Sequence, residues 1–154
     1  MQAMTATIET RPVADRNELH LANDLMAKVH HRDYFKGLGW LENSAEGYPG
    51  SRREYTRVAV RRGMVAGALR VTSETIRLGE ARLRMGGLGY VTTHPDHRHQ
   101  GIARALVSDT MAFLRRHGFH VSMLLGIPNF YSRFGFVSTL PEYEIRIDVD
   151  EALQ

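Results

Sequence analysis

The segment from Gly89 to Arg104 reads GYVTTHPDHRHQGIAR and is the most informative part of the chain. It begins like a strand, continues as a polar loop from His94, and reaches Gly101, where a helical pattern starts. Amides at the start of a helix lack intrahelical acceptors, and the helix dipole favours negative charge there. The order of strand, loop, glycine and helix therefore predicts a binding site for an anion such as a phosphate.

The residues from Gly101 to His117 predict an amphipathic helix, which Gly118 is expected to end. Its apolar positions recur at helical spacing and are Ile102, Ala103, Leu106, Val107, Thr110, Phe113 and Leu114. Beyond it the sequence predicts a short buried strand over His120–Leu125, one helical turn from Pro128 and Asn129, and strands over Phe136–Ser138 and Tyr143–Val149.

Before the loop, Leu83–Thr92 predicts a strand that contains the glycines Gly86, Gly87 and Gly89. Glycine inside a strand marks a bulge, or a place where another backbone or a ligand comes close. Both interpretations stay open from the sequence alone.

The first half of the chain predicts a strand in Met1–Arg11, two helices and a hairpin. Asp15 and Glu18 have the spacing of a capping box, which begins a helix that ends near His30. A second short helix and a loop are expected within Tyr34–Pro49. Two strands, over Tyr55–Arg61 and Met64–Ile76, are joined by a turn at Arg62 and Gly63.

Composition excludes several classes of protein. The chain has 154 residues, 43% hydrophobic and 24% charged, which is ordinary for one globular domain. It has no cysteine, which excludes a disulfide scaffold, a thiolate metal site and a cysteine nucleophile. No apolar run approaches the roughly 20 residues of a membrane span, and the N-terminus lacks the pattern of a signal peptide. We therefore expect a cytoplasmic domain with no membrane partner.

Two motifs resemble those of the GNAT superfamily of N-acetyltransferases. Neither the ATP-type pattern G-x-x-x-x-G-K-S/T nor a dinucleotide-binding G-x-G-x-x-G is present. Arg98-x-x-Gly101-x-Ala103 is similar to the family's pyrophosphate-binding signature Q/R-x-x-G-x-G/A. The run from Asn129 to Phe136 is similar to its N-x-Y-x-x-x-G-F element. The sequence from Gly126 to Phe136 resembles that of the bacterial branch that includes the acetyltransferase module of enhanced-intracellular-survival proteins.

The resemblance implies a single α/β domain over residues 1–154, with a mixed, mostly antiparallel sheet that splays at its middle and is flanked by helices. It implies acetyl-CoA as co-substrate and no metal. Tyr131 would protonate the departing thiolate, and the amides of Val91 and Thr93 would bind the pantetheine arm. The remaining expected cofactor-binding residues are Thr92, Arg98, His99, Gln100, Gly101, Ile102, Ala103, Arg104 and Asn129.

Three features leave alternatives open. The histidines His94, His97 and His99 have the spacing of metal ligands. The resemblance instead places the anion-binding loop at these residues, so we expect no metal, and His99 is expected to offer its amide rather than its ring. Trp40, with Tyr34 and Phe35, could line an acceptor pocket or pack as a satellite cluster. The general base is unassigned, and its candidates are Glu54, Glu74, Glu80, a water chain, or no base if the amine arrives neutral.

The expected function is transfer of an acetyl group from acetyl-CoA to a primary amine of a small molecule or peptide. One alternative is a non-catalytic acyl-CoA-binding protein of the same fold. The other is a nucleic-acid-binding domain, suggested because all cations except Lys28 and Lys36 are arginines. A net charge of +3 and arginines spread along the chain argue against that partner. Dimerisation is common in the family, so a homodimer is a further expectation.

Overall fold

Within the described residues, five strands form one sheet in the order β1-β2-β3-β4-β5. The computed structural model describes residues 7–139. The strands are β1 Glu9–Pro12, β2 Thr56–Arg61, β3 Met64–Leu78, β4 Ala81–Thr93 and β5 Val121–Met123. The helices are α1 Arg16–His30, α2 Tyr34–Gly47 and α3 Ile102–Arg116, and short 3-10 turns lie at Arg53–Tyr55, Pro95–His97 and Tyr131–Phe134.

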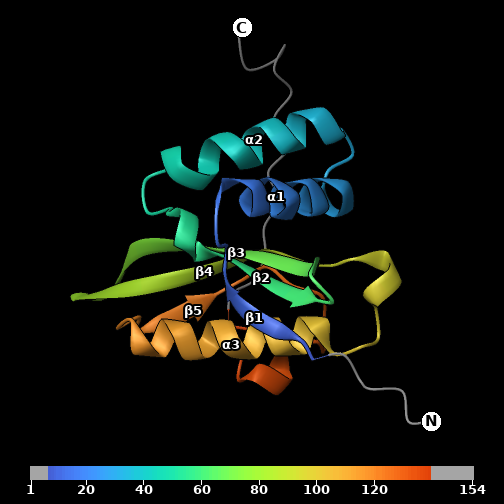
Figure 1. The fold of residues 1–154 in the computed structure, drawn as a ribbon. Helices are drawn as coiled ribbons and strands as arrows, with labels where there is room; N and C mark the ends of the chain where they lie inside the picture. The colour runs from blue at the N-terminus through green and yellow to red at the C-terminus, as the bar shows by residue number, and fades with distance from the viewer. Residues whose placement is uncertain (1–6, 140–154) are drawn as a thin grey trace, which may run out of the picture.

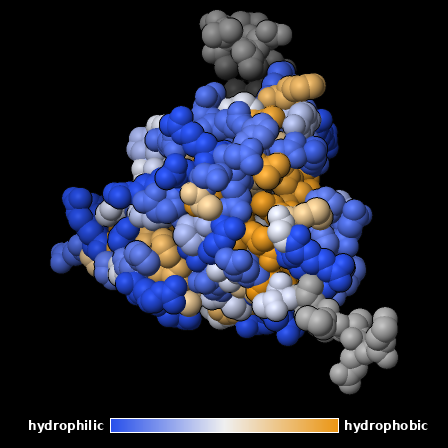
Figure 2. Space-filling view, viewed as in Figure 1, coloured by the Kyte–Doolittle hydropathy of each residue, from blue (hydrophilic) through white to orange (hydrophobic). Residues whose placement is uncertain are grey.

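The sheet forms the middle layer of the molecule, with α1 and α2 over one face and α3 over the other (Figure 1). Neighbouring strands of the described part pair antiparallel, except that β4 and β5 run parallel. This confirms the predicted mixed, mostly antiparallel sheet flanked by helices. Figure 2 shows the molecule from the same direction as Figure 1. The surface seen there is largely hydrophilic, with apolar side chains in a band that runs from α1 and α2 down to the sheet.

Local sequence explains where the first elements begin and turn. Asp15 Oδ1 accepts from the Glu18 amide at 2.8 Å, and Glu18 Oε2 accepts from the Ala14 amide at 2.7 Å, so the predicted capping interaction begins α1. The β2–β3 turn has Arg62 at φ 51° and Gly63 at φ 76°, as a two-residue hairpin of the primed type requires. Helix α2 is longer than predicted, because a narrow buried stripe supports it despite its glycines.

Strands β4 and β5 pair over a short stretch only. Their register joins Met85 to Val121, Gly86 to Ser122 and Gly87 to Met123. Beyond Gly87, β4 continues to Thr93 without a described partner on the β5 side. Because β5 ends at Met123, the pairing ends at Gly87, and the rest of β4 has an open edge within the described residues.

Two hydrophobic clusters fill the layers on either side of the sheet. One lies against α3 and includes Leu69, Val71, Leu88, Ile102, Leu106 and Val107. The other lies against α1 and α2 and includes Leu19, Met26, Leu41, Ala45, Val58 and Ala68. Buried Arg57 crosses from β2 to α3, where its Nε donates to Asp109 Oδ2 at 3.0 Å.

Several predicted strands differ from the structure. The strand expected over His120–Leu125 is only Val121–Met123, and it is half-buried rather than buried, because it is an edge of the described sheet. Phe136–Ser138 forms no strand, since no described residue pairs with it. In the first predicted strand only Glu9–Pro12 is observed, and residues 1–6 lie outside the described residues. Tyr143–Val149 also lies outside them.

Because α3 packs closely against the sheet, we expect a side chain at Gly67 to destabilise the folded state. A Cβ there would lie 2.5 Å from Ile102 Cγ2 and 2.9 Å from the backbone oxygen of Thr92. We expect Gly67→Ala to lower the free energy of unfolding by about 1–3 kcal/mol, the usual cost of overpacking. Chemical denaturation measures it.

Gly89→Ala is the matched control, because its Cβ would have one neighbour within 4 Å, Arg70 O at 3.9 Å. We expect its unfolding free energy to stay within about 0.5 kcal/mol of the parent. Equal stability of the two variants would contradict the packing described for Gly67.

Candidate functional site

The loop between β4 and α3, which we call the anion loop, has the backbone geometry that the predicted anion site needs. His99 has φ 60° and Gly101 has φ 82°, so left-handed residues alternate with others in this turn. Gly101 is the N-cap of α3 and makes no side-chain cap, and the first helical bond runs from Ala105 N to Gly101 O at 2.9 Å. The amides of Ile102 and Ala103 precede that bond and have no helical acceptor. A Cβ at Gly101 would meet nothing within 4 Å, which leaves room for an anion.

The charges around this loop favour a negative ligand. Arg98 and Arg104 are exposed on either side of Gly101. The first turn of α3 contains no acidic residue. Among residues 7–139, neither arginine takes part in an ion pair. Both cations are therefore free of described ion pairs, and their predicted role in binding an anion stays a prediction.

Strand geometry directs the amides of Val91 and Thr93 toward the open edge of β4. The His94 amide donates to Ala66 O on β3 at 2.9 Å. Amides of successive strand residues point to opposite sides, so those of Thr93 and Val91 point away from β3. On that side the pairing with β5 has already ended at Gly87. These two amides can therefore bind an extended ligand as an added strand would.

Some of the predicted cofactor-binding residues have side chains engaged within the protein. Thr92 is 1% exposed, and its Oγ1 donates to Tyr90 O at 2.7 Å. Ile102 is also 1% exposed, in the core beneath α3. Gln100 Nε2 donates to Asp96 O at 3.1 Å, within the loop itself. For Thr92 and Ile102, only the main chain can reach a ligand.

Tyr131 lies on the α3 side of the sheet, at the edge of the apolar cluster. Its ring packs edge-on against Phe130 and Phe136, with centroids 4.8 Å and 6.0 Å away. A Cβ at Gly126 would lie 2.5 Å from Tyr131 Cε2, so glycine allows the ring to approach this backbone. Burial raises the pKa of Tyr131 above its usual value of 10, which keeps the phenol protonated at neutral pH.

A cavity of about 730 Å³ lies between β5 and the segment that carries Tyr131. Asn129 lines it together with Tyr131 and has a left-handed backbone, with φ 64°. The predicted motif residues Asn129 and Tyr131 are thus brought to one cavity on the β5 side of the sheet. The anion loop lies on a separate segment, at the start of α3.

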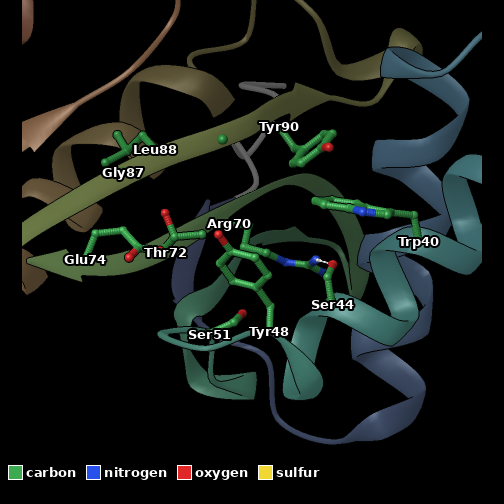
Figure 3. A pocket seen from close by; sticks show the side chains of 11 residues that line it. Trp40, Ser44, Tyr48, Ser51, Arg70, Thr72, Glu74, Gly87, Leu88 and Tyr90 are labelled. Atoms are coloured by element: carbon green, nitrogen blue, oxygen red, sulfur yellow. Dashed lines mark hydrogen bonds between the residues drawn. The ribbon is translucent and has the colours of Figure 1, made fainter. Parts of the chain in front are cut away.

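A second pocket, of about 270 Å³, opens on the α2 side of the sheet (Figure 3). Its lining comes from α2, the following loop, β3 and β4, and consists of Trp40, Ser44, Tyr48, Ser51, Arg70, Thr72, Glu74, Gly87, Leu88, Gly89 and Tyr90. A Cβ at Gly87 would lie 2.6 Å from Thr72 Oγ1, whereas a Cβ at Gly86 would lie 2.6 Å from Leu114 Cδ2. Gly86 therefore serves packing against α3, and Gly87 and Gly89 leave the pocket open.

A bulge in β4 shapes one end of this pocket. Ala68 pairs with Thr92 but Arg70 pairs with Gly89, so β4 carries an extra residue here, and Tyr90 has φ 56°. The Tyr90 ring is stacked on His31 at 5.6 Å and tilted against Trp40 at 5.8 Å. Bulges next to active sites commonly redirect side chains in this way.

The predicted aromatic group divides between the two interpretations. Trp40 lines the pocket and is 52% exposed. Tyr34 does not line it, and its hydroxyl donates to Asp24 Oδ1 at 2.6 Å. Phe35 is 82% exposed and lies outside it as well. Of these three aromatic residues, only Trp40 is therefore placed to contact a ligand in this pocket.

Arg70 is a buried cation in the pocket wall that the sequence analysis missed. It is 3% exposed, and its Nη1 donates to Leu41 O at 3.0 Å and to Ser44 Oγ at 2.9 Å. Its Nη2 donates to Asn23 Oδ1 at 2.6 Å. Burial lowers the pKa of Arg70 to about 10, so the guanidinium stays charged at neutral pH. An arginine between Leu69 and Val71, in the otherwise apolar run 64–71, was the signal in the sequence.

The structure separates the three candidate glutamates. Glu74 is half-buried on β3 and lines the pocket (Figure 3). Glu54 and Glu80 are exposed and do not line it. Among the described residues, Glu74 is therefore the carboxylate placed to act on a ligand there.

The histidines of the loop differ in their hydrogen bonding, and His97 Nδ1 is buried without a partner among the described residues. His94 Nδ1 accepts from the Asp96 amide at 3.3 Å. Within residues 7–139, no group of three or more His, Asp or Glu side chains is placed to hold a metal ion. Within the same range, no helix has the length and apolar character needed to span a membrane.

Comparison with known proteins places this geometry among acetyltransferases. The model of the acetyltransferase (GNAT) domain family matches residues 9–139. No curated protein matches the chain. Each of the similar structures that follow is 20% identical or less, which supports the fold alone.

A transcriptional regulator from Bacillus halodurans has a TM-score of 0.72 at 19% identity, covering 92% of this chain and 100% of the other. A GCN5-related N-acetyltransferase from Anabaena variabilis has a TM-score of 0.70 at 20% identity, covering 83% and 31%. Eis1 from Mycobacterium abscessus has a TM-score of 0.67 at 19% identity, covering 84% and 30%. This chain thus spans about a third of the length of the last two proteins.

The anion loop predicts that a side chain at Gly101 blocks the phosphates of acetyl-CoA. We expect Gly101→Val to weaken acetyl-CoA binding by about tenfold or more, because the valine occupies the space before the free amides. Isothermal titration calorimetry measures the affinity.

Gly118→Val is the matched control for the strain that valine suffers at a left-handed position. Gly118 has φ 71°, lies just past the other end of α3, and has open space around its Cβ. It should lose similar stability and keep acetyl-CoA affinity within about twofold. An equal loss of affinity in both variants would contradict the assignment of the loop.

Proposed function

The chain belongs to the GNAT acetyltransferase family, and from this premise we propose that it transfers the acetyl group of acetyl-CoA to a primary amine. The observation that carries the proposal is the early end of the β4–β5 pairing at Gly87, with a different opening on each face of the sheet. Tyr131 lies on one face, and the pocket with Glu74 lies on the other. A thioester held at the edge of β4 would be reached from both sides.

The chain's own backbone would hold acetyl-CoA. The amides of Val91 and Thr93 would pair with the pantetheine arm along the open edge of β4. The amides from His99 to Ala103 would bind the pyrophosphate, and Arg98 and Arg104 would add positive charge. Together these interactions would bring the thioester near the point where the β4–β5 pairing ends, because the arm would continue along β4 from the loop.

The reaction would be direct attack of the amine on the thioester. Glu74, directly or through a water, would take a proton from the incoming ammonium in the pocket. The neutral nitrogen then forms a bond with the carbonyl carbon, and an amide of the glycine-rich stretch of β4 polarises the carbonyl oxygen. The carbon–sulfur bond breaks, and Tyr131 donates its proton to the departing thiolate. The acylated nitrogen still carries a second proton to lose; it passes, directly or through water, to the Tyr131 phenolate, and Glu74 releases its proton to solvent. No covalent enzyme intermediate is formed.

Tyr131 and Glu74 have different tests. For Tyr131→Phe we expect turnover to fall about 10²–10⁴-fold, as for loss of a general acid. Affinity for acetyl-CoA should stay within about twofold, because only a hydroxyl is removed. Steady-state kinetics and calorimetry on the same sample separate the two quantities.

Tyr34→Phe is the matched control, since it removes a hydroxyl outside both openings. Its turnover should equal that of the parent. A Tyr131→Phe variant with parental turnover would return Tyr131 to a packing role.

For Glu74→Gln we expect kcat/KM at pH 7 to fall about 10²-fold or more, because a base is lost. The deficit should shrink as the pH approaches about 10, where an alkyl amine becomes neutral in solution without help. A pH profile from 6 to 10 measures this, and Glu80→Gln, at an exposed turn, should follow the parent profile. A pH-independent deficit would contradict the role of base.

A further inference from the structure

Resting on the proposed acetyl transfer, we infer that the acceptor is an amine that also carries a carboxylate, and that this carboxylate is bound beside Arg70. The pocket on the α2 side holds one cation and one carboxylate, Arg70 and Glu74, and its other lining residues are neutral. A ligand with an amine at one end and a carboxylate at the other matches both charges.

The two charges are spaced along one face of β3. Arg70, Thr72 and Glu74 alternate along the strand and all line the pocket (Figure 3). Four residues of strand separate the Cα atoms of Arg70 and Glu74 by about 13 Å. The amine and carboxylate are therefore expected several bonds apart, as in an ω-amino acid.

Arg70 lacks the ion pair that the other buried arginine of the described sheet has. Arg57 and Arg70 are both 3% exposed. Arg57 is paired with the Asp109 carboxylate. Within residues 7–139, Arg70 has only neutral acceptors, namely Leu41 O, Ser44 Oγ and Asn23 Oδ1. Buried charges in proteins are normally paired, so a ligand carboxylate would supply the missing partner.

The unused donors of Arg70 suit a carboxylate. A guanidinium has five N–H donors, and three of these are used in the bonds above. Nε is buried without a partner, and Nη2 has a second hydrogen beyond its bond to Asn23. Nε and Nη2 are the neighbouring nitrogens of one fork, which binds the two oxygens of a carboxylate.

The size and charge of the pocket limit other acceptors. At about 270 Å³ it lies just below the usual range of small-molecule pockets, so it fits a ligand of amino-acid size. A polyamine would place a second ammonium beside Arg70, where like charges repel. The aromatic rings of Trp40, Tyr48 and Tyr90 would cover the chain between the two charged ends.

Binding of matched ligands tests this inference without turnover. The probes are 6-aminohexanoate, 6-aminohexanamide and 1,6-diaminohexane, titrated into the intact chain by calorimetry with acetyl-CoA absent. We expect the carboxylate to bind about tenfold or more tighter than the amide and the diamine, as for a charge-assisted pair. Equal affinity for the three probes, or no binding of the carboxylate, would overturn the inference.

Two variants locate the site. Arg70→Lys keeps a cation but loses the fork, and should reduce the carboxylate-to-amide preference about tenfold. Arg70 also bonds to α1 and α2, so an apolar substitution there would destabilise the fold, and Gly89→Leu supplies the independent test. Its side chain enters the pocket with only Arg70 O within 4 Å of the Cβ, and binding should be lost while the fold is kept. Unchanged binding in Gly89→Leu would overturn the inference.

Acetylation of the same probes separates this inference from the proposed function. Faster transfer to the carboxylate than to the amide would support both. Carboxylate-selective binding with no acetylation of any probe would contradict acetyl transfer and support the ligand class. Equal kcat/KM for the carboxylate and the amide would overturn carboxylate recognition and support acetyl transfer.

Discussion

The early end of the β4–β5 pairing is the constraint on which the rest of the site depends. After the pair Gly87–Met123, the amides of Val91 and Thr93 lie on an open edge of β4. The same strand leads directly into the loop that begins α3 at Gly101. In the proposed function, one continuous segment would therefore provide both strand-like binding for an extended arm and free amides for an anion. The antiparallel pairing with β3 holds this segment in place.

Successive residues of β4 face opposite sides of the sheet, so its glycines have different roles. Gly86 faces α3, where Leu114 leaves no space for a side chain, whereas Gly87 and Gly89 face the pocket on the α2 side. The bulge at Tyr90 then changes the register, and His31 and Trp40 hold its ring. Packing and ligand access are thus achieved by neighbouring residues of one strand, because successive positions face opposite sides of the sheet.

Sequence patterns could predict elements that depend on local interactions. The capping residues Asp15 and Glu18 and the periodicity after Gly101 placed α1 and α3 within a residue or two. The pocket could not be predicted in this way, because its walls join α2 to two strands far away in the chain. Arg70 and Glu74 acquire their meaning only when β3 lies beneath α2. The predicted binding residues of the anion loop stay predictions until a ligand is observed there.

Amide hydrogen exchange with and without acetyl-CoA tests the central claim most directly. The claim is that the open edge of β4 binds the cofactor arm, so exchange at Val91 and Thr93 should slow when acetyl-CoA binds. The amide of Thr92 points to β3 and should already be protected, with little further change. Unchanged exchange at Val91 and Thr93, in a sample saturated with acetyl-CoA, would contradict the account.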